Sequence, residues 1–143
     1  MQAESRPKIA VLMACYNGMK WIEAQVASIL EQKQVDIELY ISVDKSEDDT
    51  LGFCQSLSKL DSRVNLLQND VRFGSASKNF FRIIEECPIK DYDFFAFADQ
   101  DDIWFDDKLF KATSYLSTHQ AVGYSSNVEA FWENGKRKSA RFV

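Results

Sequence analysis

The chain has 143 residues and a formal net charge of −5, which suits a single domain with a sizeable hydrophobic core. The acidic balance disfavours a general nucleic-acid binder, because neutralising phosphates requires a basic face. The three cysteines are widely spaced, which argues against a disulfide framework or a zinc site and is typical of a reducing, cytoplasmic compartment. No apolar stretch has the length needed to span a bilayer.

Strand-like and helix-like segments alternate along the chain. Continuous apolar runs predict the strands, and apolar residues at three- and four-residue spacing predict the helices. In chain order the pattern predicts strand Lys8–Cys15, helix Trp21–Gln32, strand Ile37–Val43, helix Glu47–Leu60, strand Val64–Leu67, helix Ser75–Glu86, strand Tyr92–Ala98, helix Asp106–Leu116 and strand Val122–Val128. Asn134 and Gly135 are a strong signal for a two-residue hairpin turn. They separate two further predicted strands, Glu129–Trp132 and Lys136–Ala140.

This alternation predicts an α/β fold. We expect an αβα sandwich with a mostly parallel central sheet, covered on both faces, in one domain of residues 1–143. Right-handed crossovers place the strand-to-helix loops at the carboxyl edge of such a sheet, where open α/β sheets bind ligands. The polar loops Tyr16–Gly18, Asp44–Asp49 and Asp99–Asp102 should therefore converge there. The chain lacks both G-x-G-x-x-G and G-K-[ST], which disfavours a dinucleotide oxidoreductase or a P-loop enzyme.

Three carboxylates, Asp99, Asp101 and Asp102, follow directly on an apolar strand. Two ionised carboxylates about 4 Å apart repel by about 4 kcal/mol at an effective dielectric constant of about 20. A cation would remove this repulsion, and oxygen ligands from so few groups suit Mg²⁺ or Mn²⁺. The alternative interpretation is a solvated acidic loop that caps the following helix.

Tyr16 and Asp44 belong to the same predicted edge, and together with the acidic loop they suit a nucleoside diphosphate. The ring of Tyr16 can lie against a base, Asp44 can accept from a base N–H or a ribose hydroxyl, and a cation at Asp101 would bridge the phosphates. Alternatively, Tyr16 is a half-buried packing residue and Asp44 caps the turn before the next helix. Their convergence on one edge favours the ligand site.

Three motifs occur in order along the chain: Ile-Ala-Val-Leu-Met-Ala-Cys-Tyr-Asn-Gly at 9–18, Ile-Ser-Val-Asp-Lys-Ser-Glu-Asp-Asp-Thr at 41–50, and Phe-Ala-Asp-Gln-Asp-Asp-Ile-Trp at 97–104. In this order they resemble family 2 glycosyltransferases of the GT-A fold. The third motif, followed by Asp107, Lys108 and Leu109, is most similar to the bacterial rhamnosyltransferase-like branch. The resemblance covers residues 8–127.

The resemblance implies a binding site for a nucleotide sugar, linked to UDP or dTDP. Tyr16 matches the aromatic residue that stacks on the base, and Asp44 matches the acid that contacts it. Lys78 and Asn79 stand where the family has an Arg-Asn pair that helps to hold the nucleotide. The chain departs from the family pattern at Ala14, Val43, Lys45, Asp49 and Asp106.

The resemblance also implies the D-x-D motif of a metal-dependent enzyme. Asp101 is then the better candidate for direct ligation of Mg²⁺ or Mn²⁺, Asp99 lies nearer the ribose, and Asp102 assists or supports the loop. The family's catalytic base comes from an acceptor-binding part, which we expect beyond Val143. This chain alone is therefore expected to bind the donor without turning it over.

The implied reaction is transfer of a sugar to an acceptor hydroxyl, with inversion, in the biosynthesis of a cell-surface polysaccharide. A saccharide or lipid-linked acceptor would bring the protein to the inner face of the membrane. The basic residues Lys136, Arg137, Lys138 and Arg141 fit a solvated edge better than a patch for anionic lipid. Apolar surface where the acceptor-binding part is absent would favour a homodimer.

Two alternatives from other classes remain at this point. A phosphoryl or nucleotidyl transferase also uses clustered aspartates on a parallel sheet, but the first strand here ends in Ala14-Cys15-Tyr16 rather than in D-x-D-x-T. A non-catalytic nucleotide-sugar-binding fragment or interaction module would keep the fold without the chemistry.

Overall fold

The structure is a computed structural model that describes residues 5–67 and 71–140, so that Arg141 of the basic cluster lies outside the described residues. The chain divides into two compact units, one ending at Phe110 and the other beginning at Lys111. The boundary falls within helix α4 (Lys108–His119). The first unit contains a parallel sheet and the second a hairpin.

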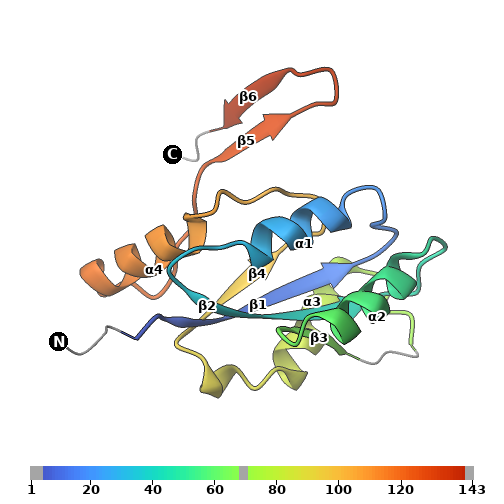
Figure 1. The fold of residues 1–143 in the computed structure, drawn as a ribbon, viewed down its shortest axis with the longest axis horizontal. Helices are drawn as coiled ribbons and strands as arrows, with labels where there is room; N and C mark the ends of the chain where they lie inside the picture. The colour runs from blue at the N-terminus through green and yellow to red at the C-terminus, as the bar shows by residue number, and fades with distance from the viewer. Residues whose placement is uncertain (1–4, 68–70, 141–143) are drawn as a thin grey trace. The chain divides into compact units, whose positions relative to one another are not determined.

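A four-stranded parallel sheet, in the order β3-β2-β1-β4, forms the centre of the first unit (Figure 1). Its strands are β1 (Lys8–Cys15), β2 (Asp36–Val43), β3 (Val64–Leu67) and β4 (Phe94–Ala98). The crossover helices are α1 (Ile22–Leu30), α2 (Thr50–Leu60) and α3 (Ala76–Glu86), with a short 3-10 helix η1 (Ile89–Asp91) before β4. The predicted α/β fold with a mostly parallel sheet is confirmed. Within the described residues, we find no helix with the length and apolar character to cross a bilayer.

Neighbouring residues of the central strand β1 serve opposite faces of the sheet. Ile9, Val11 and Met13 belong to a buried cluster that also takes in apolar residues of α1 and α2. Ala10 and Leu12 belong to the cluster on the other face, which includes residues of α3. Burial on both faces explains why the β1 sequence is a continuous apolar run rather than an alternating one.

Strand β4 departs from this arrangement. Phe95 and Phe97 are 50% and 52% exposed, although their rings pack edge-to-face against each other. Phe97 also meets Phe80 of α3 edge-to-face. The expectation of a sheet covered on both faces therefore holds for β1 and β2 but not for β4 among the described residues.

Helix α2 begins three residues later than the sequence predicts, at Thr50 instead of Glu47. The carboxylate of Asp48 accepts hydrogen bonds from both the backbone N–H and the hydroxyl of Thr50, and also from Met19 N at 3.0 Å. A short polar side chain that bonds to nearby backbone favours a turn over a helix. The residues just before Thr50 therefore form a loop.

The second unit contains an antiparallel hairpin of β5 (Val128–Phe131) and β6 (Arg137–Ala140). The predicted hairpin is confirmed, but its turn is centred one residue earlier, because Gly135 N donates to Trp132 O at 2.9 Å. Gly135, the last residue of this turn, has a φ of 81°, a left-handed conformation that glycine adopts with little strain. The predicted strand Val122–Val128 is wrong: residues 122–127 are irregular, and no neighbouring strand of the described chain pairs with them.

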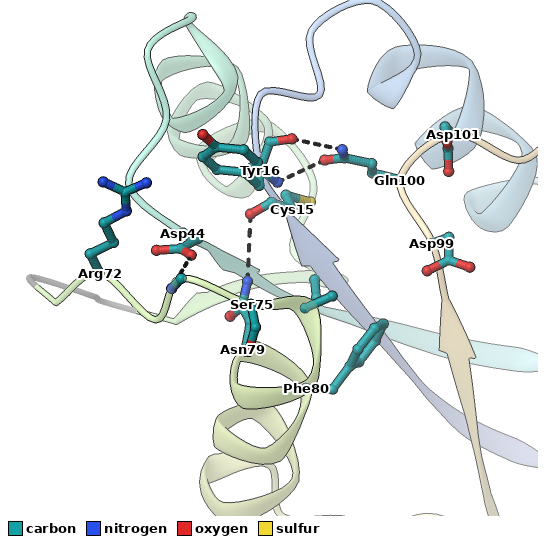
Figure 2. Close-up of a pocket in the computed structure, with 13 residues that line it drawn as sticks. Cys15, Tyr16, Asp44, Arg72, Ser75, Asn79, Phe80, Asp99, Gln100 and Asp101 are labelled. Atoms are coloured by element: carbon teal, nitrogen blue, oxygen red, sulfur yellow. Dashed lines mark hydrogen bonds between the residues drawn. The ribbon is translucent and has the colours of Figure 1, made fainter.

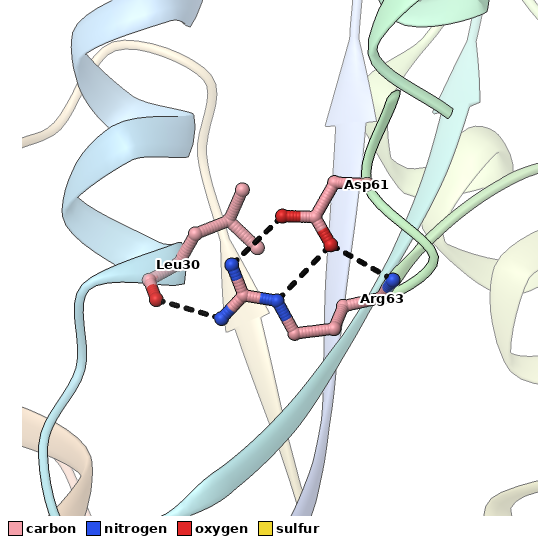
Figure 3. A network of polar contacts seen from close by, with 3 residues as sticks. All are labelled: Leu30, Asp61 and Arg63. Carbon is pink, nitrogen blue, oxygen red and sulfur yellow. Dashed lines mark hydrogen bonds and ion pairs between the residues drawn. The ribbon is translucent and has the colours of Figure 1, made fainter. Parts of the chain in front are cut away.

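A polar network joins the end of α1 to the turn that leads into β3 (Figure 3). The guanidinium of Arg63 donates to Leu30 O at 2.9 Å and makes two bonds to the carboxylate of Asp61, at 3.1 and 2.7 Å. A cation at the last carbonyls of a helix also opposes the negative end of its dipole. Arg63 therefore fixes the spacing between two crossover segments.

Arg63→Met removes these bonds while keeping most of the aliphatic stem. We expect the free energy of unfolding to fall by about 1 kcal/mol, because a half-exposed ion pair contributes little and the bond to Leu30 accounts for most of the loss. Urea unfolding followed by circular dichroism measures the change. Lys59→Met, an exposed basic residue of α2, is the control, and an equal loss in both variants would contradict the role of the network.

Candidate functional site

A cavity of about 340 Å³ lies at the carboxyl ends of the parallel strands (Figure 2). This volume is in the range of small-molecule sites, and the position is where open α/β sheets bind their ligands. Loops after β1, β2, β3 and β4 all contribute to its wall. The lining residues include five predicted from the sequence: Tyr16, Asp44, Asn79, Asp99 and Asp101. Two others, Lys78 and Asp102, are not among them.

Asp44 follows β2 and is buried in the cavity wall. Its carboxylate accepts backbone hydrogen bonds from Lys45 at 2.8 Å, Phe73 at 2.9 Å and Gly74 at 2.8 Å. Burial acts to raise the pKa of Asp44, but these bonds and the nearby charge of Arg72 outweigh it, so that the pKa lies below its ordinary value. Asp44 therefore holds the loop before α3 in place while remaining ionised.

Asn79 of α3 lies against the carboxyl ends of β1 and β2. Its Nδ2 donates to Ser42 O at 3.1 Å and to Cys15 O at 3.5 Å, which occupies carbonyls at the ends of both strands. Its Oδ1 is buried without a hydrogen-bond partner among the described residues. Lys78, the neighbour predicted with it, is exposed, and its N–H donates to the Ser75 hydroxyl that caps α3.

The basic residue at the cavity is Arg72, which sequence reasoning missed. Figure 2 shows its side chain on the β3–α3 loop near Asp44. The segment before α3 has no periodic pattern, so the sequence carries no signal for where this side chain lies. A guanidinium at a cavity rim is a good partner for phosphate oxygens, because it offers several donors in a planar fork.

Side chains of the β2–α2 loop and of the first residue of α2 hold the loop that carries Tyr16. Gly18 N donates to the Thr50 hydroxyl at 2.8 Å, and Asn17 N donates to the Ser46 hydroxyl at 3.0 Å. In return, Glu47 N donates to Asn17 Oδ1 at 2.7 Å. Tyr16 is 45% exposed and belongs to the cavity wall, so its ring can offer a flat face to a ligand.

A second contact holds the Tyr16 backbone from the side of β4. Tyr16 N donates to Gln100 Oε1 at 2.8 Å, and Gln100 Nε2 donates to Tyr16 O at 2.7 Å. Figure 2 shows the Gln100 side chain reaching from the acidic loop to the end of β1. Gln100 occupies the variable position of the predicted D-x-D motif, and nothing in its sequence context indicated this contact.

Asp99 and Asp101 stand on the same loop and line the same cavity. The side chain of Asp102 is exposed, but neighbouring protein atoms displace part of the water around its carboxylate. This desolvation, followed by the charges of Asp99 and Asp101, raises the pKa of Asp102 above its ordinary value, while Lys108 acts in the opposite direction. Asp99 and Asp101 are therefore close enough to Asp102 for their charges to disfavour its ionised form.

The donor set fits a hard divalent cation only in part. Two cavity-lining carboxylates supply oxygen ligands of the kind that Mg²⁺ and Mn²⁺ prefer, and such ions keep positions for water and phosphate oxygens. Residues 5–67 and 71–140 contain no group of three acidic, histidine or cysteine side chains arranged to hold a metal by themselves. A metal at this site would need water or phosphate oxygens to complete its coordination.

The family model described as glycosyltransferase like family 2 matches residues 7–141, which is nearly the whole chain. The chain belongs to this family. The resemblance seen in the three sequence motifs is therefore confirmed.

Curated relatives agree with this assignment. The dTDP-rhamnosyl transferase RfbG of Shigella flexneri is 45% identical over 126 residues, which cover 87% of this chain and 44% of that protein. The UDP-Glc:alpha-D-GlcNAc-diphosphoundecaprenol beta-1,3-glucosyltransferase WfgD of Escherichia coli is 33% identical over 88% of this chain and 47% of its own length. The chain thus spans about half the length of these relatives. The rhamnosyltransferase-like resemblance is also confirmed.

Solved structures share the fold. TarS of S. aureus, residues 1–349 in complex with UDP-GlcNAc, superposes with a TM-score of 0.68 over 79% of this chain and 32% of that one, at 22% identity. The mannosyltransferase PcManGT of Pyrobaculum calidifontis, in complex with GDP-Man and Mn²⁺, gives a TM-score of 0.63 over 80% of this chain and 33% of that one, at 21% identity. The expected GT-A arrangement is confirmed at the level of the fold.

Asp44→Asn tests whether the ionised carboxylate holds the β3–α3 loop. An asparagine keeps one acceptor oxygen but turns an NH₂ group toward a backbone N–H, so we expect the free energy of unfolding at neutral pH to fall by about 1 to 3 kcal/mol. Because the pKa of Asp44 is lowered in the folded protein, its contribution is complete above the unfolded pKa of about 3.9 and is lost as the pH falls through the folded pKa.

The difference between the wild type and Asp44→Asn should therefore shrink in acid, as measured by urea unfolding across that pH range. Asp36→Asn, an exposed residue at the opposite end of β2, is the matched control. A difference that is independent of pH would contradict a role for the charge of Asp44.

Proposed function

We propose that this chain is the donor-binding part of a glycosyltransferase that takes a nucleoside-diphosphate sugar, linked to dTDP or UDP. The observation that carries the proposal is the single cavity that joins Tyr16 to the carboxylates of Asp99 and Asp101 at the carboxyl edge of the sheet. A nucleoside diphosphate has an aromatic end and an anionic end. This cavity offers a flat ring for the first and a place for a cation for the second.

The names of the relatives support this choice of donor. RfbG is named a dTDP-rhamnosyl transferase, and the TarS and PcManGT structures are complexes with UDP-GlcNAc and with GDP-Man and Mn²⁺. Because this chain is 45% identical to RfbG over 126 residues, we propose that its substrate class is a rhamnosyl or hexosyl group carried on dTDP or UDP.

In the proposed complex, Tyr16 stacks on the base and Asp44 accepts from the base or the ribose through the lone pair that its three backbone bonds leave open. Asp99 and Asp101 hold Mg²⁺ or Mn²⁺ together with the diphosphate, and Asp102 supports their loop. Arg72 supplies a cation at the rim in place of Lys78. The bound metal would offset the negative charge that builds on the departing diphosphate.

We further propose that the transfer inverts the anomeric centre, with a base deprotonating the acceptor hydroxyl. None of the described residues is assigned as this base, because the cavity carboxylates are engaged with the cation or with backbone N–H groups. The alternative of a non-catalytic nucleotide-sugar-binding module would bind the same ligand without turnover in any context. A donor hydrolysis and transfer assay separates the two when this chain is supplied together with an acceptor-binding part; this chain alone is expected to bind the donor without turnover.

The proposed acceptor is a saccharide or a lipid-linked saccharide, as the diphosphoundecaprenol in the name of WfgD suggests. We place the protein in the cytoplasm, at the inner face of the membrane, where its buried cysteine thiols suit a reducing compartment. The half-exposed rings of Phe95 and Phe97 on the edge strand β4 favour a homodimer, which light scattering would detect.

Asp101→Asn tests the metal-dependent part of the proposal. Manganese should tighten the binding of dTDP or UDP to the wild-type chain, and the variant should lose at least about tenfold of this gain because a neutral amide is a poor ligand for a hard cation. Isothermal titration calorimetry with Mn²⁺ and with a chelator measures the gain. Asp36→Asn removes a charge far from the cavity and serves as the control; an unchanged gain in Asp101→Asn would remove the proposed role.

Tyr16→Ala tests the base site. Stacking of a base on an aromatic ring contributes about 1 to 3 kcal/mol, so the variant should bind dTDP or UDP about tenfold more weakly. Tyr16→Phe keeps the ring and should bind as the wild type does. Both variants retain the backbone contact with Gln100, so equal affinities of Tyr16→Ala and Tyr16→Phe would contradict stacking.

A further inference from the structure

The contact between Gln100 and Tyr16 uses both ends of one side-chain amide. Gln100 accepts from Tyr16 N at 2.8 Å and donates to Tyr16 O at 2.7 Å, as a paired strand residue would. A side chain can do this only if it carries a donor and an acceptor on one planar group at this reach. Glutamate lacks the donor when it is ionised, and asparagine is one methylene shorter.

The missing side chain of Gly18 leaves room for the amide of Gln100. A Cβ on Gly18 would lie 2.9 Å from Gln100 Cδ and closer still to its Oε1. Gly18 is not among the glycines with positive φ, so an alanine is compatible with its backbone. The glycine is therefore explained by the room that Gln100 needs, and an added methyl group would displace the amide from Tyr16.

Other contacts hold the two joined loops independently. The segment after the acidic residues is anchored to α1 and to the turn that follows it, because Trp104 N donates to the Ser28 hydroxyl at 3.0 Å and Leu109 N donates to Gln32 Oε1 at 2.9 Å. The loop of Tyr16 is anchored to the β2–α2 loop by Gly18 N and Asn17 N. Loss of the Gln100 contact would therefore leave each loop folded and change the spacing between them.

We propose that Gln100 is a positioning residue that sets the distance between the Tyr16 ring and the carboxylates of Asp99 and Asp101. The inference rests on the proposed function, since the spacing matters to a ligand that must reach both ends. A nucleoside touches only the aromatic end and is indifferent to the spacing. A nucleoside diphosphate spans the cavity, so its metal-dependent affinity depends on the spacing.

Two substitutions approach the contact from opposite sides. Gln100→Ala removes the amide, and Gly18→Ala pushes it away. Gln55→Ala, an exposed glutamine of α2, and Gly123→Ala, where an added Cβ would meet nothing within 4 Å, are the matched controls. Circular dichroism and thermal unfolding establish that all four variants are folded.

Calorimetry with UDP and dTDP in Mn²⁺, and with uridine and thymidine alone, provides the decisive comparison. Gln100→Ala and Gly18→Ala should each bind the diphosphates about tenfold more weakly and the nucleosides as the wild type does. The double variant should lose no more than either single variant, because both break one contact. The controls should match the wild type.

The inference is overturned if the folded variants bind the diphosphates with unchanged affinity, or if they lose affinity for nucleosides and diphosphates equally. If the wild-type chain binds no nucleoside diphosphate, the proposed function fails instead. Hydrogen exchange of the Tyr16 amide then tests the Gln100–Tyr16 contact without a ligand. Faster exchange in Gln100→Ala and Gly18→Ala than in the controls supports the contact, and unchanged exchange refutes it.

Discussion

The parallel pairing of β1 with both β2 and β4 is the constraint on which the site depends. Because all three strands run in one direction, the loops that leave them emerge at a single edge of the sheet. Cys15, Val43 and Ala98, the last residues of these strands, are far apart in sequence, yet each stands one position before a residue of the cavity wall. The continuous apolar sequence of β1 makes this pairing possible by filling both layers of the core.

The loops around the cavity are held by polar side chains that satisfy backbone groups. Asp44 binds the N–H groups of the β3–α3 loop, Asn79 binds the carbonyls at two strand ends, and Gln100 binds both backbone groups of Tyr16. Such bonds restrict the loops before any ligand arrives, which lowers the entropic cost of binding. The carboxylates of Asp99 and Asp101 are not used in these bonds and line the cavity.

Much of the fold was predictable, because each strand from β1 to β4 is a short apolar run and each crossover helix has regular apolar spacing. The errors fall where local pattern does not decide structure. Val122–Val128 has strand-like composition but no strand beside it, and the start of α2 depends on the bonds that Asp48 makes. At the site, topology predicted that the loops carrying Tyr16, Asp44, Asp99 and Asp101 would converge, and the family resemblance added Asn79. The places of Arg72 and Gln100 depend on loop conformations that carry no periodic signal.

The fit between Gly18 and Gln100 links two positions that are 82 residues apart in the chain. Any side chain at position 18 would occupy the space of the glutamine amide, so the two positions cannot vary independently without changing how the first and fourth strands are joined above the sheet. Transplanting the acidic motif into a related scaffold would therefore require the matching glycine as well. The motif that an engineer would have to move consists of residues from the loops after two adjacent strands, β1 and β4.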